Sequence, residues 1–252
     1  DEERTKLVLV SAAVSLRESM RLLAGQAEVC AKAGDGDKRA LDLANFDCYA
    51  CHHDLKSPSW RQKRGYTGKP GRVPMRPWPT ALVKLAIRHA AKDAEAEEMG
   101  SAFTKKWQRL QSAFEDKPFG DAKQIAPAAD DLATWAKNLA EKLDRQPCDK
   151  AAARKLLMQL PSLFKEQTPD YDSARQIAWA FQVMYKELEN KPDPGIKEVL
   201  EALRKNLKLD LPSGQKRNIS EELTSGLERL NSYNPDDFKK ALETLSARMG
   251  GQ

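Results

Sequence analysis

Apolar residues recur along this chain at intervals of three and four, the spacing that places side chains on one face of an α-helix. The first run covers residues 3–33, and its apolar positions are Leu9, Ala13, Leu16, Met20, Leu23, Ala27 and Cys30. This run predicts one long helix with an apolar seam. We expect the seam to pack on another helix of the same chain. The alternative is a seam between two copies in a homodimer.

The helical spacing continues to the C-terminus. A short helix is predicted near residues 38–46, and a helix that starts after Thr80 is expected to break or kink at Gly100. The later runs are Trp107, Leu110 and Phe114; Leu132, Trp135, Leu139 and Leu143; Leu156, Leu160 and Leu163; Ile177, Phe181, Met184 and Leu188; Val199, Leu203 and Leu207; Leu223, Leu227 and Leu230. A last helix is predicted to start at Asn234, a capping residue that precedes Pro235 and two acidic residues.

These runs predict an all-α protein built as a helical bundle. The chain has 252 residues, a length that suits one large domain or two small ones. Its mean hydropathy is −0.67, yet the regular apolar spacing argues against a disordered chain. The sequence contains no run of 18 apolar residues, so we expect no transmembrane segment.

Residues 56–79 interrupt the helical pattern with five prolines and three glycines. A loop of about 24 residues inside a compact domain is uncommon unless it has a function. Positive charge gathers in the same region, because residues 55–92 contain ten basic residues and no acidic one. The net charge of the whole chain is only +5. This segment therefore calls for an anionic ligand or partner.

Two of the four cysteines lie in the sequence Cys48-Tyr49-Ala50-Cys51-His52. The pattern C-x-x-C-H is the attachment signature of a c-type haem. Its spacing follows from the chemistry, since two thiols add to the two vinyl groups of one haem and the next residue places an imidazole under the iron. We therefore expect one covalent haem c on Cys48 and Cys51, with His52 as the proximal iron ligand.

Two other uses of the paired cysteines have less support. A structural zinc site usually needs four ligands in two pairs, and the sequence has neither a second C-x-x-C nor an H-x-x-x-H. A thioredoxin-like dithiol needs a strand–helix–strand setting, which the helical pattern does not offer.

Covalent haem attachment takes place outside the cytoplasm, so we expect a periplasmic or otherwise extracytoplasmic protein. A chain that begins at Asp1 fits a mature form from which a signal peptide has been removed. In an oxidising compartment Cys30 and Cys148 can form a disulfide. The alternative is two separately buried thiols, and the sequence does not choose between them.

Two residues are candidates for the sixth iron ligand. Met75 lies between Pro74 and Pro77, so a stiff extended loop is expected to present its thioether. His89 is the rival, because its helical spacing places it on the inward face of the predicted helix with Leu82 and Ala86. Water, an empty position or a partner chain remains a further alternative.

The basic segment offers groups for the two haem propionates. Arginine can bind a carboxylate through two parallel hydrogen bonds, and tryptophan or tyrosine can donate one. The residues expected to contact the cofactor in this way are Trp60, Arg61, Tyr66, Arg72, Arg76 and Trp78. The remaining cations are expected to form a docking patch for an acidic redox partner, or else to be solvated. No nucleic-acid-binding motif is present.

Residues 45–62, Asn-Phe-Asp-Cys-Tyr-Ala-Cys-His-His-Asp-Leu-Lys-Ser-Pro-Ser-Trp-Arg-Gln, resemble a family of exported bacterial c-type cytochromes. The likeness continues through Gly65-Tyr66, through Gly68-Lys69-Pro70-Gly71-Arg72 and through Arg76-Pro77-Trp78-Pro79. It implies covalent haem on Cys48 and Cys51 with His52 as ligand. Members of the family often occur as segments of larger multihaem proteins, whereas this chain carries one C-x-x-C-H.

These observations favour a mono-haem electron carrier over an enzyme. We expect residues 1–100 to form the haem-binding region and residues 101–252 a helical region packed on it, as two parts or one continuous domain. One alternative function is a peroxidase-like enzyme or small-ligand sensor with an open distal site. Another is a helical module that docks a partner protein.

Overall fold

The computed structural model describes residues 3–33, 41–47, 69, 72–115, 117–161, 169–188, 193–207 and 233–250. Helices make up most of these residues. Within the described ranges, strand-like pairing is confined to an isolated antiparallel bridge between Phe46 and Met75. The prediction of an all-α protein is therefore confirmed.

The chain divides into two compact units. One comprises residues 9–147, and the other joins residues 1–8 to residues 148–252. Helix α4 (Asp93–Ser112) continues through Gly100 without a break. Gly100 is half-buried, and a Cβ atom added there would meet nothing within 4 Å, so neither a close neighbour nor a break in the helix explains this glycine.

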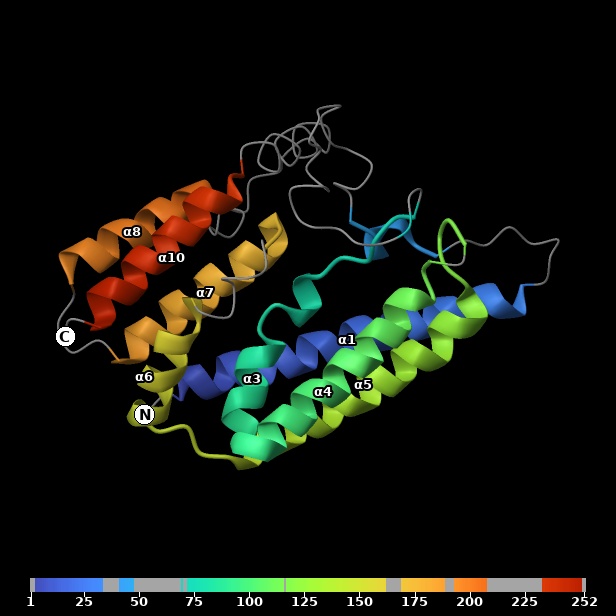
Figure 1. The fold of residues 1–252 in the computed structure, drawn as a ribbon, viewed down its shortest axis with the longest axis horizontal. Coiled ribbons are helices and arrows are strands. Elements are labelled where there is room, and N and C mark those ends of the chain that lie inside the picture. The colour runs from blue at the N-terminus through green and yellow to red at the C-terminus, as the bar shows by residue number, and fades with distance from the viewer. Residues whose placement is uncertain are drawn as a thin grey trace, which may run out of the picture. The chain divides into compact units, whose positions relative to one another are not determined.

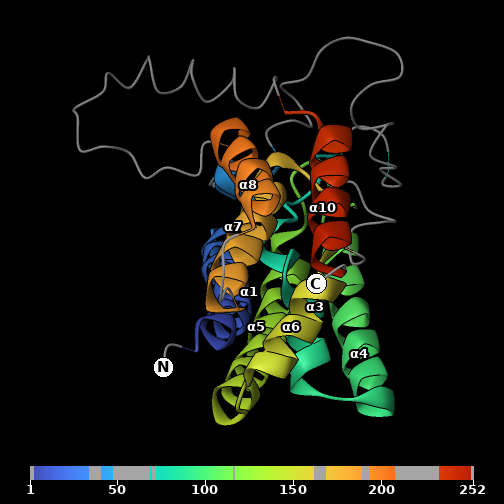
Figure 2. The ribbon, with the colours of Figure 1, turned by 90° about the vertical axis from the view of Figure 1, so that its left-hand side faces the viewer.

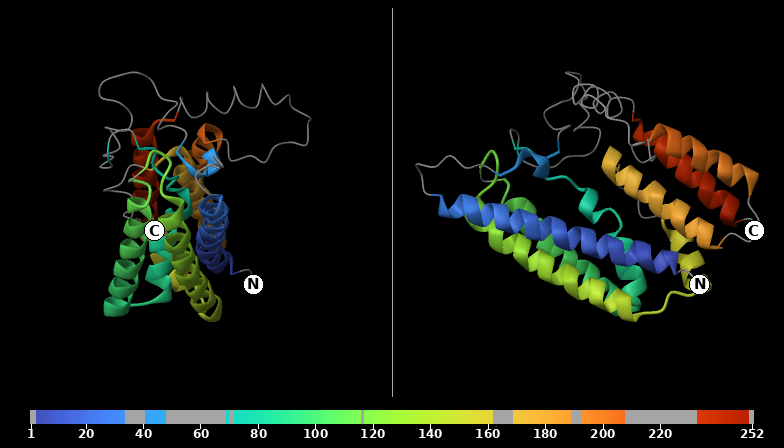
Figure 3. Two further views of the ribbon diagram at one scale, coloured as in Figure 1. Left: turned by 90° about the vertical axis from the view of Figure 1, so that its right-hand side faces the viewer. Right: turned by 180° about the vertical axis from the view of Figure 1, so that it is seen from behind.

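Helix α1 (Arg4–Lys32) confirms the long helix predicted at the N-terminus. Every residue of its predicted apolar seam is buried except Cys30, which is half-buried. The seam therefore packs within the chain, as expected. In the first unit α4 packs on α5 (Ala122–Arg145), and Figures 1 and 3 show α1 running along α5.

The helix expected after Thr80 is the short α3 (Val83–Ala90), which packs against α4 and α5. It ends at residues 91–93, where Asp93 adopts a φ of 48°. Aspartate tolerates this left-handed conformation better than most residues. The predicted break in the helical run is thus real, but it lies before Asp93 and not at Gly100.

The segment before the cysteine motif is not the helix predicted over residues 38–46. Its described part, residues 41–47, contains a single 3-10 turn, η1 (Leu43–Asn45). Asp42 caps this turn by accepting a hydrogen bond from the Ala44 N–H at 2.9 Å. A second 3-10 turn, η3 (Trp78–Thr80), closes the proline-rich stretch.

The second unit contains α6 (Lys150–Gln159), α7 (Tyr171–Leu188), α8 (Pro194–Asn206) and α10 (Pro235–Gly250). Helix α7 packs on α6 and α8, and α10 packs on α8 and α6 (Figure 2). The predicted inner face of the last helix is confirmed by the burial of Phe238, Leu242, Leu245 and Met249. The run at Leu223, Leu227 and Leu230 lies outside the described residues.

Side-chain caps explain where several helices of this unit begin. Asp149 accepts a hydrogen bond from the Ala152 N–H at the start of α6, and Asp193 accepts one from the Gly195 N–H at the start of α8. Asn234 accepts one from the Asp236 N–H at 3.0 Å, as its position before Pro235 predicts. At α1 the cap comes from α7, because the Glu187 carboxylate accepts hydrogen bonds from both the N–H and the hydroxyl of Thr5.

Candidate functional site

The cysteine motif itself, Cys48 to His52, lies outside the described residues, as do Trp60, Arg61 and Tyr66. The structure does describe the residues that lead into the motif, 41–47, and those that follow the basic loop, 72–80. These two segments belong to the unit of residues 9–147. Their arrangement defines the described part of the candidate site.

An antiparallel bridge joins the two segments. The Asp47 N–H donates to the Pro74 carbonyl at 2.9 Å, and the Arg76 N–H donates to the Asn45 carbonyl at 3.1 Å. Phe46 and Met75 lie directly opposite each other between these two bonds. Such opposed residues project their side chains to the same face, with Cα atoms about 4.5 Å apart. Met75 is thereby held beside a residue only two positions before Cys48.

Side chains reinforce this bridge. The Arg76 Nε atom donates to the Phe46 carbonyl at 3.0 Å, so Arg76 binds the partner segment through both its backbone and its side chain. The Asn45 Nδ2 atom donates to Gln26 Oε1 of α1 at 2.6 Å and to the Asp42 carbonyl at 3.0 Å. The segment before the motif is thus tied to the long helix on one side and to the Met75 segment on the other.

An aromatic cluster of Phe46, Phe114 and Phe119 supports the bridge from the connection between α4 and α5. The Phe46 ring meets the Phe114 ring edge to face at 5.7 Å and the Phe119 ring at 5.8 Å. Phe46 and Phe114 are buried, whereas Phe119 is 48% exposed. Two rings of the cluster are therefore buried, and the third is partly exposed to solvent.

Gly120 shapes the turn that carries this cluster. Its φ is +84°, a conformation that residues with a Cβ atom rarely adopt. A Cβ atom there would lie 2.5 Å from Cδ1 of Ile125 and 3.0 Å from Cδ1 of Phe114. Glycine is required at this position for both reasons.

The sequence assigns Arg72 and Arg76 to the haem propionates. In the structure, the Nε atom of each donates a hydrogen bond to a backbone carbonyl. For Arg72 the acceptor is the Glu115 carbonyl after α4, at 2.7 Å. Each of these bonds uses one of the five N–H donors of a guanidinium. Trp78 is half-buried in η3. Propionate binding by these three residues stays a prediction.

His89 lies at a different place in the same unit. It belongs to the last turn of α3, is 8% exposed, and precedes α4 by four residues. The Phe46 ring packs beyond the other end of α4, a helix of 20 residues and hence about 30 Å long. Figure 1 shows α3 beside the first turns of α4. The structure brings Met75, and not His89, next to the segment that enters the motif.

Part of the predicted basic surface is visible on α3 and just after it. Lys84, Arg88 and Lys92 are exposed, and α3 itself contains no acidic residue. None of the three forms an ion pair with another described residue. An exposed cluster of cations without carboxylate partners attracts anionic surfaces.

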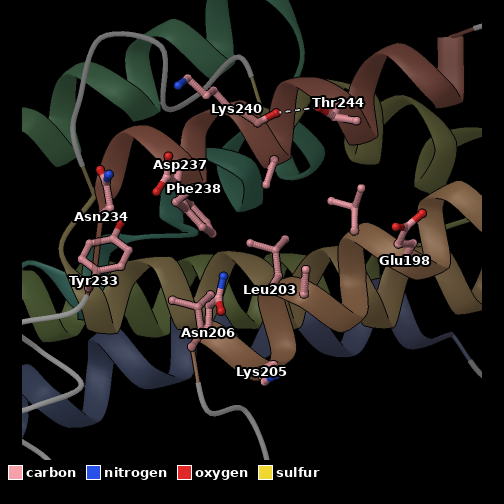
Figure 4. A pocket seen from close by; sticks show the side chains of 14 residues that line it. Glu198, Leu203, Lys205, Asn206, Tyr233, Asn234, Asp237, Phe238, Lys240 and Thr244 are labelled. Atoms are coloured by element: carbon pink, nitrogen blue, oxygen red, sulfur yellow. Dashed lines mark hydrogen bonds between the residues drawn. The ribbon is translucent and has the colours of Figure 1, made fainter.

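The second unit contains a groove of about 750 Å³ between α8 and α10. Figure 4 shows Leu203 and Phe238 facing each other across it, and both side chains are buried. Exposed charged residues, among them Lys205 and Asp237, line its edges. None of its described lining residues has an imidazole, thiol or thioether group. Among the side chains that bind haem iron in proteins it offers the phenol of Tyr233, whose hydroxyl donates to the Pro169 carbonyl at 3.0 Å.

The other two cysteines, Cys30 and Cys148, are both free thiols. Cys148 is buried and borders a cavity with Glu3, Arg4 and Glu187. Burial, followed by the negative charges of Glu187 and Asp149, raises the pKa of the Cys148 thiol to about 11. Cys148 is therefore protonated at neutral pH.

Several features of the site escaped sequence reasoning. Phe119, Gly120 and Asn45 belong to no motif, although the Phe-Gly pair just before the helix cap Asp121 was a usable sign of a tight turn.

In the described ranges, no group of three potential metal-ligating His, Cys, Asp or Glu side chains occurs. No helix among those residues is both long and apolar enough to cross a bilayer.

Comparison of the chain with protein-family models, curated proteins and solved structures gave no match.

Proposed function

We propose that this protein is a mono-haem c-type cytochrome that transfers electrons, with the haem bound to Cys48 and Cys51 and with His52 as the proximal ligand. The motif C-x-x-C-H carries the proposal. A structural zinc site would need a second pair of ligands, and a redox dithiol would need a strand–helix–strand setting; the sequence offers neither. The resemblance around residues 45–79 supports it.

The described surroundings of the motif fit such a cofactor. A haem needs an apolar environment and, for electron transfer, two axial ligands that stay in place. Phe46 and Met75 project to one face of the bridge, and Phe119 places a half-exposed ring against Phe46. A thioether is one of the axial ligands found in c-type cytochromes. When bound, the haem supplies one reversible oxidation and reduction of iron.

Met75 is the proposed distal ligand, with His89 as the alternative. The bridge holds Met75 opposite Phe46, and Phe46 precedes Cys48 by two residues. Since two residues span at most about 7 Å, the thioether belongs to the immediate neighbourhood of the attachment site. His89 lies toward the opposite end of α4. The hydrogen bonds from Arg76 to the Phe46 carbonyl and from Asn45 to Gln26 would hold Met75 in this position.

The partner in electron transfer is proposed to be a protein with an acidic surface. Lys84, Arg88 and Lys92 are exposed and lack carboxylate partners among the described residues. Electrostatic attraction of this kind raises association rates and weakens as salt is added.

The absorption spectrum of the oxidised holoprotein tests the ligand assignment. We expect the weak long-wavelength band of thioether-coordinated ferric haem in the wild type, its loss in Met75→Ala, and its retention in the control His89→Ala. The reduced wild type should bind carbon monoxide slowly, because Met75 must leave first. A wild type without the band that binds carbon monoxide rapidly would contradict a six-coordinate electron carrier and support the open-site alternative.

A further inference from the structure

We infer that a cavity between the start of α1 and helix α7 binds an amphipathic anion, a small molecule with an apolar chain and a carboxylate headgroup. All of the described lining of this cavity belongs to the unit that joins residues 1–8 to residues 148–252. The segments of the candidate haem site belong to the other unit. The inference therefore goes beyond the proposed function and does not depend on it.

The cavity has a volume of about 540 Å³, which lies within the range of about 300–1,000 Å³ that is typical of small-molecule sites. On α7 its lining residues are four and three positions apart, the spacing that places side chains on one face of a helix. The described residues that line it are Glu3, Arg4, Leu7, Trp179, Val183 and Lys186.

Hydrogen bonds hold the two walls of the cavity together. The Glu187 carboxylate, in the last turn of α7, accepts one from the Thr5 N–H at 2.5 Å and one from the Thr5 hydroxyl at 2.6 Å. Thr5 is fully buried. The start of α1 is thus tied to α7 without a ligand, so the cavity is formed in advance, as ligand sites usually are.

The apolar part of the lining is open to solvent. Leu7 is 60% exposed and Trp179 is 37% exposed, and Val183 beside them is half-buried. Two of the exposed large apolar side chains of the described residues therefore line the same cavity. Exposed apolar surface gathered in a concave place is typical of a ligand-binding groove. A bound apolar chain would cover this surface.

Positive charge borders the apolar surface. Arg4 and Lys186 line this cavity and also a second one of about 530 Å³. Lys186 is exposed and forms no ion pair with another described residue. Glu3 lies on the same lining, but its carboxylate pairs with the Lys6 ammonium group at 3.3 Å. A carboxylate headgroup at Arg4 and Lys186 would complement their charge.

A cationic headgroup is the competing occupant, because Asp1 and Glu2 precede the described residues. Octanoate, 1-octanol and octylammonium share the same chain and differ in the charge of the headgroup, so they separate the alternatives. Proton NMR of the full chain follows the indole N–H signal of Trp179, which is identified by its loss in Trp179→Phe.

We expect octanoate to shift this signal saturably, with an affinity about threefold to tenfold higher than that of octanol or octylammonium. Added salt should weaken the binding of octanoate. A signal that does not shift with octanoate, or an affinity for octylammonium that equals or exceeds that for octanoate, would overturn the inference.

Two variants test the lining with the same signal. Leu7→Ala removes an exposed apolar side chain and should weaken octanoate binding about threefold to tenfold. Lys186→Gln should weaken it about threefold and reduce its dependence on salt. Lys84→Gln is the control, since it removes an exposed lysine from the other unit and should bind octanoate like the wild type. Equal effects of Lys186→Gln and Lys84→Gln would show a general effect of net charge and would refute the site.

Discussion

At the scale of single residues, Gly120 and Cys148 show how local conformation and burial set properties that their residue types alone do not reveal. Gly120 adopts a φ of +84° beside the aromatic cluster. Cys148 is a buried thiol close to carboxylates. Each leads to a measurable consequence.

Substitution of Gly120 should destabilise the fold. Left-handed backbone costs a residue with a Cβ atom about 1–2 kcal/mol, and the new atom would also approach Ile125 Cδ1 to 2.5 Å. We expect Gly120→Ala to lower the free energy of unfolding by about 2–4 kcal/mol. Gly25→Ala is the control, because its Cβ atom would meet nothing within 4 Å in α1; it should be neutral or stabilising by up to about 1 kcal/mol. Denaturant unfolding measures both, and equal effects would contradict the turn geometry.

The raised pKa of Cys148 predicts a loss of stability at alkaline pH. The thiol ionises near pH 9 in the unfolded chain and near pH 11 in the folded one. The unfolded state therefore loses its proton first, and the stabilisation present below about pH 9 disappears as the pH rises to about 11. We expect a decrease of about 2–3 kcal/mol at most from this group.

The measurement compares unfolding free energies at pH 8 and pH 11 under reducing conditions. Cys148→Ala should lose this part of the pH dependence, whereas Cys30→Ala should retain it. A Cys148→Ala protein with the full wild-type pH dependence would show that burial of this thiol does not contribute.

At the scale of the elements, sequence periodicity predicted the helices whose apolar faces are regular. The seam of α1 and the capped start of α10 both follow from residues within one or two turns of each other. The prediction of a helix over residues 38–46 was wrong. Asp42 caps a 3-10 turn, and the Asn45 side chain donates a hydrogen bond to Gln26. Such a tertiary contact has no signature in local spacing.

In the candidate site, too, local sequence predicted some features and tertiary contacts determined others. Motif chemistry identified Cys48, Cys51 and His52, and the prolines around Met75 indicated an extended backbone. The bridge that joins Met75 to Phe46 connects residues 29 positions apart through two hydrogen bonds. A single pair of this kind leaves no alternating pattern, so the sequence could name Met75 as a candidate but not place it.

At the scale of the whole molecule, the all-α class follows from the sequence, whereas the boundary between the units does not. The sequence suggests either two parts that meet near residue 100 or one continuous domain, whereas the compact units of the structure are residues 9–147 and residues 1–8 with 148–252. Gly100 was expected to break or kink its helix, but α4 continues through it, because an isolated glycine is tolerated inside a helix at a cost of about 1 kcal/mol. The true boundary has weaker signals, a proline at 147 and a helix cap at Asp149.

The intact mass of the protein, produced in the periplasm of a bacterium that has the haem-attachment machinery, tests the central claim most directly. We predict a wild-type mass that exceeds the polypeptide by one haem and survives denaturation. In the variant with Cys48→Ala and Cys51→Ala the added mass should be absent, while Cys30→Ala should keep it. A wild-type protein with the mass of the bare polypeptide under these conditions would contradict the assignment.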